Sequence, residues 1–288
     1  CRTPGQLLSL FFKENGKVMN PLQEYLSSTP VEKVNTSMVA YVANLTKVAE
    51  VAPDIASDVV KEFDTQRKHL KLIASENYCS INTQAAMGNL LTDKYAEGYP
   101  AHRYYGGCEN VDSVESTAAE EAKALFGVDH AYVQPHAGAD ANVVAYWAIL
   151  NKKIEMPSLE EVGETNLSHL TDDQWARLRA RLGNQRLLGL DYYSGGHLTH
   201  GYRQNVSARM FDAYSYTVDK ETGLLDYDAI EKQAMEVKPL ILLAGYSAYP
   251  RAINFKRFRQ IADKCGAVLM VDMAHFAGLV AGKVFVGE

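Results

Sequence analysis

An acidic residue and a histidine follow a short apolar run near the end of this 288-residue chain. Residues 267–271 are apolar and typical of a buried strand, and Asp272 and His275 come directly after them. In open α/β sheets, ligands bind outside the carboxyl ends of the strands. This spacing suits a flat heterocyclic cofactor, because the carboxylate can keep a ring nitrogen protonated while the imidazole reaches a ring oxygen.

A turn of small residues lies at 134–142, between a predicted strand and a predicted apolar helix. Ala137, Gly138 and Ala139 let backbone N–H groups approach an anion, which the positive end of a helix dipole attracts. The same residues also suit a tight strand-to-helix turn chosen for packing alone. Neither a G-x-G-x-x-G nor a Walker pattern is present, so both interpretations stay open.

A histidine flanked by glycines occurs in the segment 194–201, Ser-Gly-Gly-His-Leu-Thr-His-Gly. The imidazole of His197 can lie flat on an aromatic cofactor from such a loop, although a loop histidine that only makes hydrogen bonds has the same sequence. A metal pair of His197 and His200 lacks a third ligand in register. We therefore predict no metal site.

Four tyrosines and the acid Glu97 occur within the fourteen residues 94–107. Exposed tyrosines are typical of interfaces and binding sites, because the ring is apolar and the hydroxyl is polar. A carboxyl that is partly desolvated among aromatic rings suits general acid–base work. A dimer-interface loop without chemistry is the alternative, and the two interpretations are compatible.

The elements that would position these residues alternate along the chain. Apolar spacing and capping residues predict helices at 53–72, 111–125, 141–150, 175–182 and 255–265, and buried strands at 131–134, 240–243 and 267–271. Buried strands alternating with helices indicate an α/β fold, a mainly parallel sheet with helices on both faces. We expect an N-terminal arm with helices at 1–72 and a large domain at 73–288, with a polar insertion at about 152–190.

Composition excludes several classes of protein. The net charge of −6 argues against a nucleic-acid partner, which favours basic chains. No apolar run approaches the roughly 20 residues of a membrane span, so no membrane partner is expected. The four cysteines are scattered without a Cys-x-x-Cys pair, which favours a reducing cytoplasm.

Six segments resemble the serine hydroxymethyltransferase family and occur in that family's order. They are residues 72–78, 94–107, 134–136, 195–201, 246–249 and 271–281. The resemblance implies the large domain of the aspartate-aminotransferase-like fold. It also implies pyridoxal 5'-phosphate as cofactor, tetrahydrofolate as co-substrate, and serine and glycine as substrates.

The resemblance implies a role for each matching residue around the cofactor. Asp272 matches the acid that pairs with the pyridine nitrogen, and His197 the imidazole stacked on the ring. Ser247 and His275 match groups near the phenolic oxygen. The residues Ala137, Gly138 and Ala139 match the phosphate turn. In this family the turn commonly reads Ser-Gly-Ser, so two hydroxyl donors are replaced here.

Further matches concern the substrates and the partner subunit. Ser75 matches a serine near the substrate carboxylate, and Glu97 the carboxyl that handles protons during one-carbon transfer. Tyr95 and Tyr105 match tyrosines that reach, with Glu97, into the partner's site, which implies a homodimer or homotetramer. The residues implied to contact folate are Tyr192, which stands near a position where leucine is common, and Gly196, His197 and Leu198.

The family's Schiff-base lysine has no counterpart in these residues, since its segment would follow Glu288 and Lys283 does not match it. We expect the full-length protein to interconvert serine and glycine, and these 288 residues alone to be inactive and to hold the cofactor loosely. The alternatives are a threonine-aldolase-like enzyme of the same fold, or a non-catalytic truncated chain that only assembles with a partner.

Overall fold

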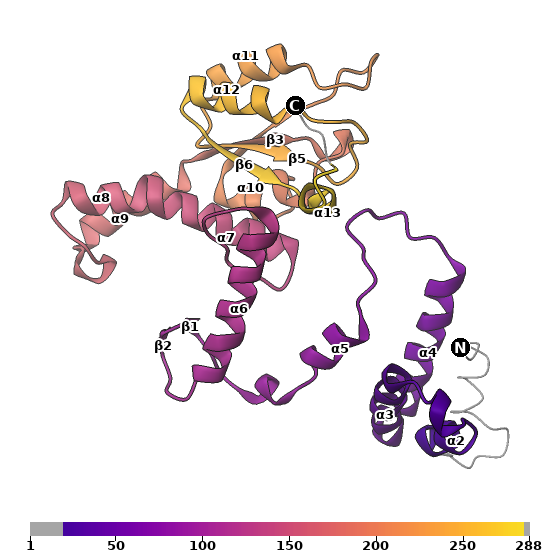
Figure 1. Cartoon of the computed structure of the whole chain (residues 1–288). Helices are drawn as coiled ribbons and strands as arrows, with labels where there is room; N and C mark the ends of the chain where they lie inside the picture. Colours follow the sequence, from indigo (N-terminus) through magenta and orange to yellow (C-terminus); the bar gives the residue numbers. More distant parts are fainter. Residues whose placement is uncertain (1–19, 285–288) are drawn as a thin grey trace. The chain divides into compact units, whose positions relative to one another are not determined.

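The computed structural model describes residues 20–284, which form two compact units divided between Glu97 and Gly98 (Figure 1). The expected domain boundary at residue 72 does not coincide with this division. Residues 73–97 belong to the first unit because the helix at Ile81–Met87 packs on an earlier helix of that unit.

The first unit is helical. Its elements are α2 (Pro21–Ser27), η1 (Val31–Lys33), α3 (Thr36–Val51), α4 (Pro53–Lys68), α5 (Ile81–Met87) and η2 (Leu90–Asp93). Helices α3 and α4 pack through Val42, Leu45, Ala56 and Val60. This confirms the predicted helix after residue 52, although that helix ends at Lys68.

The buried face of α4 differs from the predicted one. Helical spacing in the sequence places Ile55 and Val59 on one face with Val60 and Phe63, which predicts that they face inward, but Ile55 and Val59 are exposed. The stripe that meets α3 contains Ala56, Val60 and Phe63 instead. A small residue at position 56 lets the two helices approach closely, and this turns the larger side chains of Ile55 and Val59 outward.

The second unit combines helices with a parallel sheet. Its elements are β1 (Gly98–Tyr99), β2 (His102–Arg103), α6 (Glu109–Phe126), α7 (Gly138–Leu150), η3 (Asn151–Glu155), α8 (Met156–Glu161), η4 (Leu167–His169), α9 (Asp172–Gly183), β3 (Arg186–Leu190), η5 (Tyr192–Ser194), η6 (Leu198–His200), α10 (Ser207–Met210), β4 (Asp212–Tyr216), α11 (Tyr227–Val237), β5 (Ile241–Gly245), α12 (Phe255–Cys265), β6 (Val268–Asp272) and α13 (Ala277–Ala281).

The central sheet has four parallel strands in the order β4-β3-β5-β6. Gly245 at the end of β5 lies opposite Asp272 at the end of β6. All four strands therefore end at the same edge of the sheet. The predicted α/β class and the two predicted strands near 240–243 and 267–271 are confirmed.

Both faces of the sheet are covered (Figure 1). Leu188, Leu242 and Ala244 pack on one face with residues of α11 and α12. Leu187, Ile241 and Leu243 pack on the other face with residues of α7. Successive side chains of a strand point to opposite faces, so strands buried on both sides are apolar throughout.

The predicted strand at 131–134 is wrong. These residues form no ladder with any strand among residues 20–284, and Tyr132 is exposed. A short apolar run predicts a strand only where a neighbour offers backbone partners, because backbone groups must be paired.

The segment at 152–190 also differs in detail from the expected insertion. Its last five residues are β3, the strand between β4 and β5. The part before β3 is mostly helical, and α9 opens with a capping box of Thr171 and Gln174, a pattern that the local sequence at 171–174 also predicts. The excursion from the sheet therefore ends before Arg186.

Gly245 has no room for a side chain where β5 ends. Its φ is +112°, and an added Cβ would lie 2.0 Å from the carbonyl oxygen of Asp272. We expect Gly245→Ala to destabilise the second unit by about 3 kcal/mol or more, measured by urea unfolding.

Gly183→Ala is the matched control, because nothing lies within 4 Å of its added Cβ. It should change the free energy of unfolding by no more than about 1 kcal/mol. Equal stability of the Gly245 and Gly183 variants would contradict the close approach of β5 to β6.

Candidate active site

The strand order gives the sheet a topological switch point between β3 and β5. The connection after β3 leads to β4 on one side, whereas the connection after β5 leads to β6 on the other. In open α/β sheets ligands bind at such a switch point. The loops that follow β3 and β5 meet there, since the N–H groups of Ser247 and Ala248 donate to the carbonyl of Gly195 at 2.8 and 3.0 Å.

The Asp272 carboxylate is the centre of a hydrogen-bonded cluster at this edge. Its Oδ2 accepts a bond from Nε2 of His200 at 2.9 Å and from Nδ2 of Asn142 at 2.9 Å. Its Oδ1 accepts the N–H of Ala274 at 3.2 Å. Three separate segments of the chain therefore hold one carboxylate in place.

Asp272 is ionised because these donors outweigh its burial. Desolvation alone would raise the pKa of the carboxyl, but the hydrogen bonds from His200, from Asn142 and from the backbone N–H of Ala274 lower it well below its usual range. The site therefore has a fixed negative charge at neutral pH.

The hydrogen bonds of His200 define its tautomer. The N–H of His197 donates to Nδ1 of His200 at 3.3 Å, so Nδ1 accepts. The ring proton is then on Nε2, the atom that faces Asp272. His200 is 2% exposed, so neither the ring nor this proton is accessible to solvent.

The His197 imidazole is held through its Nδ1 atom. The N–H of Thr199 donates to it at 3.2 Å, and the Thr199 hydroxyl lies 2.8 Å away. Burial, then the neighbouring His200, lowers the pKa of His197. A neutral ring in this position can lie against an aromatic ligand without adding a charge.

Four residues of the cluster were not predicted to act together. Asn142 also donates to the Thr199 hydroxyl at 2.7 Å, and the Tyr146 hydroxyl donates to the Thr199 carbonyl at 2.6 Å. His200 had been considered only as a metal ligand. The signal available was the i, i+4 spacing of Asn142 and Tyr146, which places both on one face of the helix that begins at Gly138.

His275 offers a buried polar atom to a ligand. Among residues 20–284, its Nδ1 is one of three buried side-chain atoms without a hydrogen-bond partner. His275 also contributes to the electrostatic environment of His197. A buried polar group without a partner costs free energy, so a ligand atom that pairs with it would be favoured.

The predicted anion turn is the N-terminus of α7. Ala137 is the N-cap, and its side chain makes no capping bond to the helix. Gly138 and Ala139 begin the helix, and all three residues are exposed. The turn thus presents the positive end of a 13-residue helix at the same edge as Asp272, to which Asn142 in the second turn of that helix is bonded.

The residues expected to contact folate lie in the loop after β3. Gly196 is buried, whereas the Tyr192 and Leu198 side chains are exposed. The ring of Tyr192 packs on those of Tyr193 and Tyr202, with centroids 5.3 and 5.0 Å away. This part of the edge is therefore an open aromatic surface.

The remaining predicted site residues are exposed. Ser75, Tyr95 and Glu97 belong to the first unit, and Tyr105 follows β2 in the second unit. Their approach to the sheet edge stays a prediction.

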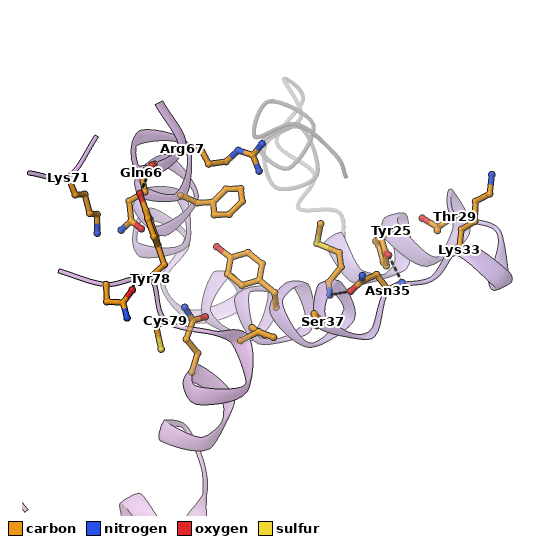
Figure 2. Close-up of a pocket in the computed structure, with 16 residues that line it drawn as sticks. Tyr25, Thr29, Lys33, Asn35, Ser37, Gln66, Arg67, Lys71, Tyr78 and Cys79 are labelled. Atoms are coloured by element: carbon orange, nitrogen blue, oxygen red, sulfur yellow. Dashed lines mark hydrogen bonds between the residues drawn. The ribbon is translucent and has the colours of Figure 1, made fainter. Parts of the chain in front are cut away.

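The first unit also contains an open groove of about 1090 Å³ between its helices. Tyr25 and Asn35 lie toward one end of it, and Lys71 and Tyr78 toward the other (Figure 2). The Lys71 ammonium lies 5.2 Å from the centroid of the Tyr78 ring. The Asp272 cluster is a feature of the second unit alone.

Comparison with known proteins gives the family. The model of a family described as serine hydroxymethyltransferase matches residues 48–182 and 177–287. The chain belongs to the serine hydroxymethyltransferase family. The match begins within α3, so α2 precedes it.

Curated relatives named serine hydroxymethyltransferase cover most of this chain. The protein of Treponema pallidum (strain Nichols) is 67% identical over 267 residues, which are 93% of this chain and 46% of the relative. The protein of Mycolicibacterium smegmatis is 56% identical over 254 residues, 88% of this chain and 52% of the relative. The protein of Chlamydia trachomatis serovar D is 50% identical over 255 residues. The chain spans about half the length of these serine hydroxymethyltransferases.

Residues 20–284 contain neither a metal-binding cluster nor a membrane-spanning helix. No group of three or more His, Cys, Asp or Glu side chains in this range is arranged to hold a metal ion. No helix within it is both long and apolar enough to cross a membrane.

Proposed function

We propose that the complete protein interconverts serine and glycine and transfers the one-carbon unit to tetrahydrofolate, with pyridoxal 5'-phosphate as cofactor. The observation that carries this proposal is the Asp272 carboxylate, which is kept ionised at the switch point of the sheet by His200 and Asn142. The family membership of the chain supports it independently.

The donor set at the edge fits pyridoxal phosphate. When bound, this cofactor supplies an electron sink for charge that develops at the α carbon of the amino acid. Asp272 would keep the pyridine nitrogen protonated, and His197 would support the ring face. His275, with its unpaired Nδ1, and Ser247 would orient the phenolic oxygen.

The phosphate would bind at the N-terminus of α7. The backbone N–H groups of Gly138 and Ala139 are the donors there, and Ala137 and Ala139 contribute no hydroxyl. Backbone donors and the helix dipole therefore have to provide more of the phosphate affinity than in a turn with two serines.

The other predicted residues complete this assignment. Glu97 would move protons during one-carbon transfer, with Tyr95 and Tyr105 beside it in a homodimer or homotetramer. Ser75 would bind the amino-acid carboxylate. The loop with Tyr192, Gly196, His197 and Leu198 would contact folate. A cytoplasmic location belongs to the same proposal, and the free thiols of Cys79, Cys108 and Cys265 support it.

The test is turnover by the complete protein. With serine, tetrahydrofolate and added pyridoxal phosphate, we expect glycine to form, and we expect the rate to fall strongly when tetrahydrofolate is omitted. Glycine release is measured by chromatography.

Threonine without folate is the discriminating control. If the protein cleaves threonine faster than it converts serine, and folate has no effect, it is an aldolase rather than the proposed transferase. A protein that turns over neither amino acid would support the non-catalytic alternative.

A further inference from the structure

Arg103 is the centre of a second polar cluster, beneath the hairpin of β1 and β2. Its side chain is only 3% exposed. Nε donates to Asp112 Oδ1 at 2.8 Å, Nη2 to Glu115 Oε2 at 2.6 Å, and Nη1 to the Gly98 carbonyl at 3.1 Å. One guanidinium thus joins both strands of the hairpin to two carboxylates of α6.

The cluster continues to the segment before α7. The Gln134 amide Nε2 donates to Glu115 Oε1 at 2.7 Å and to the Gly98 carbonyl at 2.9 Å. Its oxygen accepts the Tyr132 hydroxyl at 2.8 Å. Glu115 and the Gly98 carbonyl are therefore shared between Arg103 and Gln134.

Helix α6 has no buried apolar side chain that could hold the hairpin in place if these polar contacts were lost. None of the 18 residues of α6 is buried. Within the hairpin, Ala101 has a φ of +61°, and its N–H donates to Asp112 Oδ2 at 2.9 Å. That bond, with the one from Arg103, lowers the pKa of Asp112. Loss of Arg103 would leave two partly buried carboxylates without their cation, which strongly favours opening of the hairpin.

We propose that Arg103 is a positioning residue. It couples the hairpin of β1 and β2, which the tyrosines of residues 94–107 flank, to the predicted phosphate turn at 137–139. The two ends of the network carry two parts of the site, and in this respect the inference rests on the proposed function. Tyr105 follows Arg103 by two residues, and Ala137 follows Gln134 by three. A change at Arg103 therefore alters phosphate binding at a turn it does not touch.

The first test needs no cofactor and uses hydrogen exchange of the complete protein. Arg103→Gln should speed exchange of amides in 134–141 as well as in 98–105, and Gln134→Leu should do the same in both segments. Arg257→Gln is the matched control, because Arg257 also bridges two carboxylates, Asp228 and Glu231, but on the far helices α11 and α12. If each substitution sped exchange only in the segment that contains the substituted residue, the proposed coupling would be wrong.

The second test compares pyridoxal phosphate with pyridoxal, which lacks the phosphate. Arg103→Gln should raise the Kd of pyridoxal phosphate about 10-fold, a difference of about 1.4 kcal/mol. It should change the Kd of pyridoxal by less than about 2-fold, and Arg257→Gln should change neither. Equal weakening of both ligands would show a general loss of structure and overturn the proposal.

Arg103→Lys keeps the positive charge but replaces the planar guanidinium, whose three nitrogens reach Asp112, Glu115 and the Gly98 carbonyl, with a single compact ammonium. It should give intermediate exchange and an intermediate Kd, and it serves as the test if Arg103→Gln does not fold. Wild-type protein that binds no pyridoxal phosphate would refute the proposed function, and the exchange experiment would still decide the coupling. Faster exchange in both segments would then support the coupling through Arg103, and faster exchange in one segment alone would refute it.

Discussion

Asp272→Asn is expected to lower kcat/KM for serine in the complete protein by about 10²- to 10³-fold, which corresponds to roughly 3–4 kcal/mol. The amide has nearly the same shape but carries no charge, so it cannot keep a ring nitrogen protonated. The loss should appear in kcat rather than in the KM for serine, because the charge acts on the chemical step. Steady-state kinetics with saturating cofactor measure it.

Asp263→Asn is the control for this experiment, since Asp263 is an exposed partner of Arg259 on α12. It should leave kcat/KM within about 2-fold of the wild-type value, as expected for a surface pair. Turnover of the Asp272 variant close to wild type would show that the carboxylate has another role.

His200→Leu is expected to destabilise the protein by about 3 kcal/mol, because it leaves a partly buried carboxylate without one of its two side-chain donors. The melting temperature should fall accordingly. His200→Gln can donate from its amide and should recover part of the loss. His169→Leu, an exposed histidine beside Glu164, should have no comparable effect.

His200→Leu should also move the acid limb of the activity–pH profile to higher pH. In the wild type the depressed pKa of Asp272 means that its ionised form, and the stability it confers, persist as the pH falls below the ordinary range for aspartate. Without His200 that pKa rises, so activity should disappear at a higher pH on acidification. An acid limb at the same pH in both proteins would contradict the role of His200.

Local signals in the sequence predicted much of this fold. The capping box at Thr171 and the Asn254 and Gly266 boundaries of α12 are formed by neighbouring residues, so the local sequence is sufficient. Strand β4 and helix α11 were not predicted. The side chains of β4 show no clear alternation between buried and exposed positions. This strand lies at the edge of the four-stranded sheet, where only β3 pairs with it.

The candidate site was predictable only in part, for a related reason. Asp272 was found because it ends an apolar run, which is a local feature. Its partners were not, because His200 and Asn142 are 72 and 130 residues away in the sequence. Only the assembled fold brings them together, and no spacing rule connects them.

Because Asp272 is so far from His200 and Asn142 in the sequence, the complete cluster exists only after the sheet has folded. A ligand that depends on Asp272, Asn142 and His200 together can bind only a chain in which α7, the loop after β3 and the end of β6 are all in place. Such a ligand stabilises the finished state by mass action and gives no help to a half-formed sheet. Contacts over such distances also form late, since closing long loops costs entropy before it is compensated. Cofactor supplied during synthesis should therefore protect completed molecules from degradation without speeding their folding.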